Sequence, residues 1–206
     1  MKSSTAAVAI IVFLLFGLVG GYMIGAPSLQ GSVNNLTAQV AARDSTIVGL
    51  QNQVASLRAS ANISVLGPYF SPDGPCQAQV IAWIGRANTS LHVLIYSFTN
   101  DQIGAAVQAA HTRGVDVKVV FEYEQISQYS EYEKLLAAGV SVRVDSNSAL
   151  MHDKVAIVDS KYVLTGSFNW SAAAQEDNNE NILVLKNMSL ATVYEAEFQK
   201  IWNAAL

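Results

Sequence analysis

The stretch that decides the fold and the chemistry of this chain is Met151-His152-Asp153-Lys154-Val155-Ala156-Ile157-Val158-Asp159, followed by Thr165-Gly166-Ser167-Phe168-Asn169-Trp170-Ser171. The apolar run 155–158 predicts a short buried strand, along which side chains alternate between two faces. His152 and Lys154 therefore point the same way. An imidazole can attack phosphorus, an ammonium can neutralise a phosphoryl oxygen, and Ser167 and Asn169 can donate hydrogen bonds to the other oxygens. This combination predicts phosphodiester chemistry.

The spacing H-x-K-x4-D with a downstream Gly-Ser-x-Asn resembles the signature of the phospholipase D superfamily. The resemblance spans residues 65–202 and also includes Tyr69-Phe70-Ser71-Pro72, Tyr96-Ser97-Phe98-Thr99, Arg113-Gly114-Val115-Asp116-Val117 and Asn178-Asn179-Glu180-Asn181. With one copy of the signature, the chain is similar to the small members of the superfamily, which are the bacterial Nuc-type endonucleases and the mitochondrial cardiolipin hydrolases. The resemblance implies an α/β fold with a phospholipase D-like sheet sandwiched between helices.

The resemblance also implies roles for individual residues. His152 would be the catalytic nucleophile that forms a covalent phosphohistidine, which water then opens. Lys154, Ser167 and Asn169 would bind the phosphate, although a plain β-turn also uses Gly-Ser and Asn. Glu180 falls where the family carries an acid that hydrogen-bonds the catalytic His, as in a triad. A polar loop before a strand is the alternative for Glu180.

Three further residues are predicted to be structural. Asp159 completes the signature, but it lies at the far end of the predicted strand from His152. This distance makes it a poor proton partner, so we expect a structural ion pair or a turn-stabilising role. His92 and His111 have no partner residues nearby in the sequence and are predicted to be structural.

The sequence predicts no metal and no cofactor. It has one cysteine, no H-E-x-x-H motif and no paired-carboxylate cluster, which are the common routes to zinc or two-metal hydrolysis. A covalent His mechanism still needs a general acid for the leaving oxygen, and the chain has one signature His. The resemblance implies a homodimer with a composite active site, in which one His152 attacks while its symmetry mate donates the proton.

The N-terminal part of the 206 residues is predicted to attach the chain to a membrane. After a flank at residues 1–5, residues 6–26 are uncharged and almost wholly apolar, which indicates a transmembrane signal anchor. A removed signal peptide is the alternative, but Ile24-Gly25-Ala26 is a poor cleavage site. Lys2 precedes the span and the next positive residue is Arg43, so we expect a cytoplasmic N-terminus and an extracytoplasmic catalytic domain.

Residues 27–61 are predicted to form a coiled-coil stalk that begins at a joint, Pro27-Ser28. Apolar residues recur every seven positions in two registers, a and d. The a positions are Val33, Val40, Ile47 and Val54, and the d positions are Leu36, Arg43, Leu50 and Leu57. β-Branched residues at a with Leu at d favour a parallel two-stranded coiled coil. A loosely helical, monomeric stalk is the alternative.

Residues 62–206 are predicted to form the catalytic domain from alternating strands and helices. The predicted strands are 91–97, 115–121, 140–144, 155–158, 162–165 and 181–185. The predicted helices are 103–111, 131–138 and 190–202.

The substrate is the least determined feature. Residues 62–206 hold 9 Lys and Arg against 15 Asp and Glu, a formal net charge of −6, whereas a general DNA binder is expected to carry a basic surface. An endonuclease acting on DNA or RNA is the main interpretation because the domain most resembles that subgroup. The alternatives are a phospholipase D or cardiolipin hydrolase acting on membrane lipids, and a catalytically inactive, membrane-anchored scaffold.

Overall fold

The computed structural model describes the backbone of residues 3–61 and 63–206 and the side chains of residues 14–23, 29–54 and 63–206. The chain forms two compact units, Met1–Leu57 and Arg58–Leu206. The first unit is formed by helix α1 (Ser3–Ala61), which continues through Pro27, where the sequence predicts a joint. The fixed φ of proline is itself helical, so Pro27 removes one backbone donor without ending the helix here.

The predicted membrane and stalk segments both fall on α1. Among the residues that the structure describes, no helix has a stretch long and apolar enough to cross a membrane. The predicted span 6–26 lies partly outside them, since the side chains of 6–13 and 24–26 are not described. The heptad side chains from Val33 to Val54 are exposed on the single helix, and Leu57 lies outside the described side chains. The anchor and the coiled coil stay predictions.

The second unit is built on one seven-stranded sheet in the order β1-β7-β6-β5-β2-β3-β4. Strands β2, β3 and β4 are parallel, and all other neighbouring pairs are antiparallel. The strands are β1 (Ser64–Ser71), β2 (Ser90–Ile95), β3 (Asp116–Phe121), β4 (Ser141–Val144), β5 (Lys154–Val158), β6 (Tyr162–Gly166) and β7 (Glu180–Lys186).

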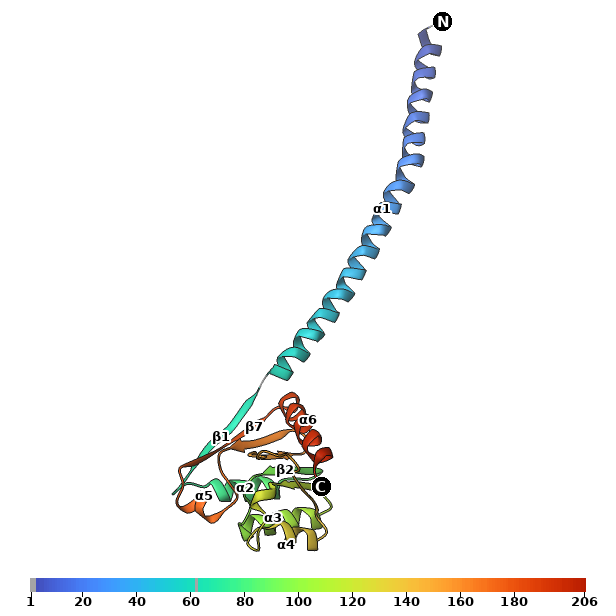
Figure 1. Ribbon diagram of the computed structural model, residues 1–206. Helices are drawn as coiled ribbons and strands as arrows, with labels where there is room; N and C mark the ends of the chain where they lie inside the picture. The colour runs from blue at the N-terminus through green and yellow to red at the C-terminus, as the bar shows by residue number, and fades with distance from the viewer. Residues whose placement is uncertain (1–2, 62) are drawn as a thin grey trace. The chain divides into compact units, whose positions relative to one another are not determined.

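Helices cover both faces of this sheet (Figure 1). One face carries α2 (Cys76–Gly85), α3 (Asp101–Thr112), α4 (Tyr132–Ala137) and α5 (Ala172–Glu176), and the other carries α6 (Met188–Ala204). A short 3-10 helix, η1 (Tyr123–Gln125), follows β3. Along β5, alternate side chains enter the two cores, with Ala156 and Val158 in one and Val155 and Ile157 in the other. The predicted α/β sandwich is confirmed.

Each strand and helix predicted between residues 90 and 204 is present, with its ends shifted by a few residues. The sequence did not predict β1, α2 or α5. Strand β1 contains Gly67 and Pro68, which weaken a strand signal, and it lies at the edge of the sheet, where proline is tolerated. Helix α5 has five residues, too few for a helical period to emerge.

The strands of the sheet finish at two opposite ends, called here the motif end and the distal end. The motif end is defined by Ser71, Ile95, Lys154, Gly166 and Glu180, which end or begin neighbouring strands there. The distal end is defined by Ser64, Ser90, Val158, Tyr162 and Lys186. Because β1 begins at Ser64, the N-terminal part of the chain joins the sheet at the distal end.

Candidate active site

His152 and Lys154 lie together at the motif end, where the chain enters β5. His152 is exposed just before the strand, whereas Lys154 is its first residue and is only 8% exposed. The Nζ atom of Lys154 donates a 2.7 Å hydrogen bond to the backbone oxygen of His152. The site therefore places an accessible imidazole beside a buried ammonium.

Tyr96, which follows β2, contacts both of these side chains. Its ring centroid lies 4.4 Å from that of His152 and 4.5 Å from the Nζ atom of Lys154. The Nε2 atom of Gln125 donates to the Tyr96 hydroxyl at 3.2 Å, which holds the ring in place. The aromatic face attracts the ammonium. The sequence contained Tyr96 only within a longer family motif, and its place follows from the pairing of β2 with β5, which no local pattern predicts.

The electrostatics of Lys154 suit anion binding. Burial lowers the pKa of Lys154, and the negative charges of Asp153 and Glu180 partly oppose this effect. Burial acts this way because it removes water that would solvate the ammonium. The same loss of water strengthens the attraction to an incoming anion. A phosphate at this position would therefore be held more tightly than by a solvated lysine.

Ser167 and Asn169 lie in the turn after β6, at the same end of the sheet. The Ser167 Oγ atom accepts hydrogen bonds from the backbone N–H and side-chain amide of Asn181, at 3.2 and 3.4 Å. A Cβ atom at Gly166 would collide with the backbone oxygen of Asn181, so this close approach requires glycine. The Oδ1 atom of Asn169, a hydrogen-bond acceptor, is buried and has no partner within the described residues, whereas the amide nitrogen of the same side chain is the group that can donate to a phosphoryl oxygen.

Glu180 begins β7 at the motif end, and its carboxylate accepts a 3.2 Å hydrogen bond from the Asn178 side chain. Within residues 63–206, no hydrogen bond joins Glu180 to His152. Glu180 acts on the site through its charge, which favours the ammonium form of Lys154. Its predicted role in orienting His152 stays a prediction.

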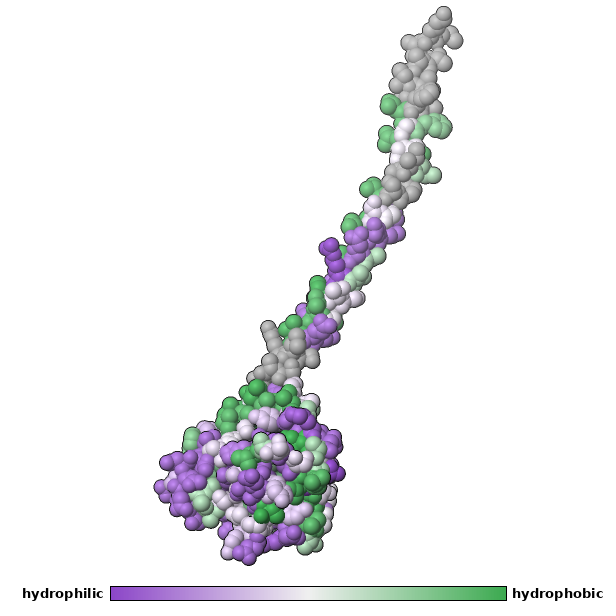
Figure 2. All heavy atoms as spheres, viewed as in Figure 1, coloured by the Kyte–Doolittle hydropathy of each residue, from purple (hydrophilic) through white to green (hydrophobic). Residues whose placement is uncertain are grey.

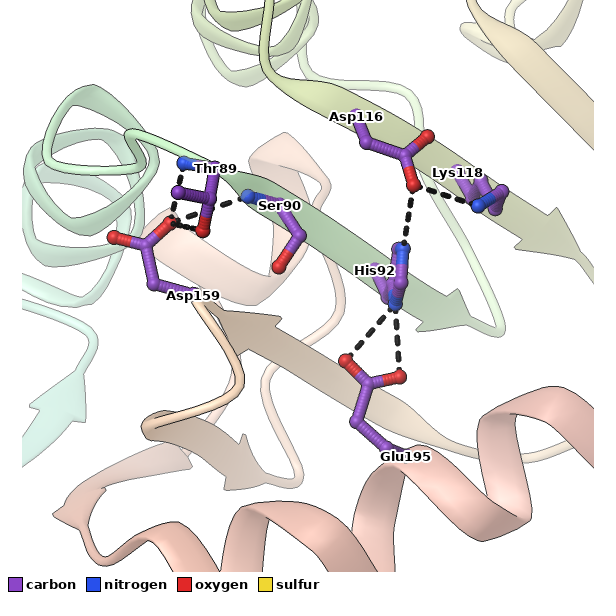
Figure 3. A network of polar contacts seen from close by, with 7 residues as sticks. All are labelled: Thr89, Ser90, His92, Asp116, Lys118, Asp159 and Glu195. Carbon is purple, nitrogen blue, oxygen red and sulfur yellow. Dashed lines mark hydrogen bonds and ion pairs between the residues drawn. The ribbon is translucent and has the colours of Figure 1, made fainter.

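Asp159 lies in the turn after β5, at the distal end, with a φ of 53° that asparagine and aspartate tolerate well. Its carboxylate accepts hydrogen bonds from the backbone N–H groups of Asn88, Thr89 and Ser90 and from the Thr89 hydroxyl, at 2.8 to 3.3 Å. Figure 3 shows the contacts with Thr89 and Ser90. Burial raises the pKa of Asp159, but these donors outweigh it, so the net pKa is lowered. The contacts stabilise a turn, and within residues 63–206 the carboxylate is in no ion pair.

His92 has partners that the sequence did not indicate, because they come from distant elements (Figure 3). Its Nδ1 atom lies 2.8 Å from a Glu195 carboxylate oxygen, and its Nε2 atom lies 3.5 Å from Asp116. Its ring stacks on Phe198 with centroids 4.6 Å apart. These contacts fix α6 on the sheet and are remote from the motif end.

A pocket of about 430 Å³ adjoins His152 on the α6 side. Its lining combines acidic, basic and apolar side chains: Asp145, Met151, His152, Asp153, Glu197, Lys200 and Ile201 among others. Among the residues that the structure describes, no group of three or more His, Cys, Asp or Glu could hold a metal ion. The pocket leaves open space beside the imidazole of His152.

The structure is a mixed α/β sandwich that brings His152, Lys154, Ser167 and Asn169 to one end of its sheet, an arrangement that suits chemistry on a phosphodiester. Comparison with known proteins narrows this assignment. Residues 80–202, more than half of the chain, match the family described as "Cardiolipin synthase, PLD-like domain". The chain belongs to this phospholipase D-like family.

Individual relatives agree with this assignment. Among solved structures, Nuc from Salmonella typhimurium, a phospholipase D family member, is 38% identical with a TM-score of 0.66, covering 70% of this chain and 97% of that one. NucT from Helicobacter pylori is 26% identical with a TM-score of 0.65, covering 70% of this chain and 99% of that one. Mouse mitochondrial cardiolipin hydrolase is 38% identical over 57% of this chain and 53% of its own length. The chain spans about half the length of the curated relatives it matches.

Proposed function

We propose that this hydrolase cleaves phosphodiesters without a metal ion, through a covalent phosphohistidine at His152, and that nucleic acid is its main substrate. The observation that carries the proposal is the accessible imidazole of His152 next to the buried ammonium of Lys154, with Tyr96 against both. Together they offer a nucleophile and a fixed positive charge to the same phosphate.

The chemistry takes two steps. A ring nitrogen of His152 attacks phosphorus, so that an N–P bond forms while one P–O bond breaks and the leaving oxygen takes up a proton. Water then gives up a proton to the base that the first step left behind and attacks the same phosphorus, so the N–P bond breaks and both His152 and the general acid are regenerated. Lys154, Ser167 and Asn169 hold the phosphoryl oxygens throughout, which stabilises the charge that develops in each transition state.

The proton for the leaving oxygen is proposed to come from His152 of a second copy in a twofold-symmetric homodimer. Co-refolding wild-type chains with His152→Ala chains in equal amounts tests this arrangement. Random pairing leaves about a quarter of the dimers with both histidines, so activity per total dimer should fall to about a quarter. Independent sites would retain about half.

The path of the chain supports a substrate taken from solution. Strand β7 separates Glu180 at the motif end from Lys186 at the distal end, where the N-terminal part joins, and seven residues span about 20 Å. We propose that an N-terminal anchor with a cytoplasmic N-terminus holds the hydrolase outside the cytoplasm, with its site at the far end. A membrane phospholipid is the second candidate substrate, favoured by the cardiolipin hydrolases and phospholipase D among the relatives.

Turnover of single-stranded DNA, duplex DNA, RNA and cardiolipin vesicles should be compared with excess EDTA present. We expect nucleic-acid cleavage that resists EDTA, and a covalent phosphoryl adduct on His152 after quenching in alkaline denaturant, because the N–P bond is labile in acid. Cleavage of cardiolipin alone would replace the nuclease with the lipid hydrolase. Loss of all activity in EDTA, restored by Mg²⁺ or Zn²⁺, would contradict the metal-free mechanism.

A further inference from the structure

A second pocket, of about 750 Å³, lies at the distal end of the sheet, away from His152. It is formed between the end of α2, the segment before β2 and the β5–β6 turn. Its lining residues are Trp83, Arg86, Asn88, Thr89, Asp159, Lys161 and Tyr162. The proposed hydrolysis uses none of them.

Two cations flank an aromatic pair in this pocket. The rings of Trp83 and Tyr162 lie 4.9 Å apart. The Arg86 guanidinium carbon lies 4.5 Å from the Trp83 ring centroid, and the Lys161 Nζ atom lies 5.4 Å from that of Tyr162. Within residues 63–206, neither cation is in an ion pair. The aromatic faces hold the cations in place and leave their charge available to an anion.

The one carboxylate in the lining, that of Asp159, offsets only one of these two positive charges. Asp159 is engaged by four hydrogen-bond donors from residues 88–90. A third cation, Lys186, pairs in register with Tyr162 on the neighbouring strand and is also outside the ion pairs of residues 63–206. In and beside this pocket, three cations therefore stand against one carboxylate, on a domain whose net charge is −6.

Apolar side chains are exposed around the same end. Figure 2 shows hydrophobic side chains gathered on the second unit where β1 begins. Ser64 pairs with Lys186, and next to this pair Ile63, Val65 and Leu66 are 49%, 59% and 40% exposed. Met188, two residues after Lys186, is 68% exposed. Cations beside exposed aliphatic and aromatic side chains are the composition of surfaces that lie in a membrane interface.

We propose that the distal end of the catalytic unit docks on an anionic lipid bilayer, with a lipid headgroup phosphate in the pocket between Arg86 and Lys161. The boundary between headgroups and acyl chains would take up the side chains of Ile63, Val65, Leu66 and Met188. A nucleic acid offers no comparable apolar surface for them. Since Lys154 and Asp159 are five residues apart along β5, docking holds the phosphate ligands of the site about 16 Å further from the bilayer, facing solution.

The test uses the full chain in vesicles of 30% phosphatidylglycerol and 70% phosphatidylcholine that contain a headgroup quencher. A fluorophore is placed on Met188→Cys, and in a matched protein on Tyr123→Cys, which is 71% exposed beyond the motif end of β3. The native Cys76 is buried and escapes labelling. We expect strong quenching at position 188, weak quenching at 123, and loss of the difference in pure phosphatidylcholine vesicles.

Variants separate the pocket from a general charge effect. Arg86→Gln with Lys161→Gln should lower the ratio of docked to undocked protein about 25-fold, since each cation near an anionic surface contributes about fivefold. Lys134→Gln with Lys200→Gln removes the same charge elsewhere and should change the ratio less than twofold. Thermal melts of both variants test whether they fold.

Three results would overturn the proposal. Equal quenching at positions 188 and 123 would contradict docking through the distal end. Unchanged quenching in the Arg86/Lys161 variant would contradict phosphate binding in the pocket. If the fluorophore at position 188 became buried in the absence of lipid, and more so at higher protein concentration, the apolar surface would instead bind a second copy of the chain. None of these results bears on hydrolysis at His152.

Discussion

The two ends of β5 carry residues of one sequence signature, yet their environments differ. At the motif end, the ammonium of the buried Lys154 donates a hydrogen bond to the backbone oxygen of His152 and, within residues 63–206, is in no ion pair, so its charge stays available to a substrate anion. At the distal end, the Asp159 carboxylate is saturated by donors from the segment before β2. A charge left unsatisfied is available for chemistry, whereas a saturated one stabilises the fold. One signature thus combines a reactive half and a structural half.

The largest effect is expected from His152→Ala, which removes the attacking nitrogen and, in a symmetric dimer, the general acid. Turnover should fall at least about a thousandfold, while the melting temperature stays within about 2 °C because the side chain is exposed. Steady-state kinetics and thermal melts measure both. His111→Ala on α3 is the matched control and should keep full turnover. Substantial activity in His152→Ala would end its assignment as the nucleophile.

Lys154→Gln should reduce kcat by about a hundredfold to a thousandfold, as expected for losing one fixed charge at a developing phosphoryl anion. The pH profile sharpens this prediction. Burial lowers the pKa of Lys154, so the active ammonium is lost, and activity falls, at a lower pH than for a solvated lysine. Lys154→Arg, which stays charged, should move this alkaline decline upward. If the alkaline decline of activity stayed at the same pH in Lys154→Arg, the decline would be caused by the titration of another group.

Asp159→Asn should act on stability instead. It keeps the side-chain shape and the tolerance for positive φ but weakens charge-assisted hydrogen bonds, so the free energy of unfolding should fall by about 1–3 kcal/mol. Turnover per folded molecule should change less than about threefold. If the variant had wild-type stability but no activity, Asp159 would have a role in catalysis and not in stability.

Acid should abolish the contribution of Asp159 to the free energy of unfolding. Its pKa is lowered in the folded protein, so its stabilisation is fully present above the unfolded pKa of about 4 and is lost as pH falls through the folded value. The stability difference between wild type and Asp159→Asn should therefore be constant from about pH 5 to 7 and shrink below about pH 4. Urea titrations at several pH values measure it, and a difference that grows in acid would contradict the sign.

The smallest effect on chemistry is expected from deleting residues 1–61, since the catalytic unit has its own core. Turnover at high protein concentration should stay within about twofold. If residues 33–57 form the predicted coiled coil, the dimer without them should dissociate more readily on dilution. Sedimentation of soluble proteins with and without residues 33–57 measures this, and equal dimer affinity would reduce the stalk to a spacer.

The sequence predicted the motif, the alternation along β5 and the central strands, because these depend on local periodicity. It did not predict β1, whose Gly67 and Pro68 break the strand pattern, or the partners of His92, which lie 24 and 103 positions along the chain. The family resemblance implies a hydrogen bond between Glu180 and His152 that is not among the contacts of residues 63–206, so this role stays a prediction. Spacing along one segment says little about distances between segments.

By itself, the sequence determined the residue types of the site and the α/β class, since a nucleophile, a cation and a strand period are properties of short segments. Only the tertiary structure decided that Tyr96 lies against His152 and Lys154, that Asp159 ties β5 to the segment before β2, and that the N-terminal part joins the sheet at the end opposite the motif. These facts depend on which strands pair and in which direction. Strand pairing is set by burial of the whole sheet between its helices, which no single segment contains.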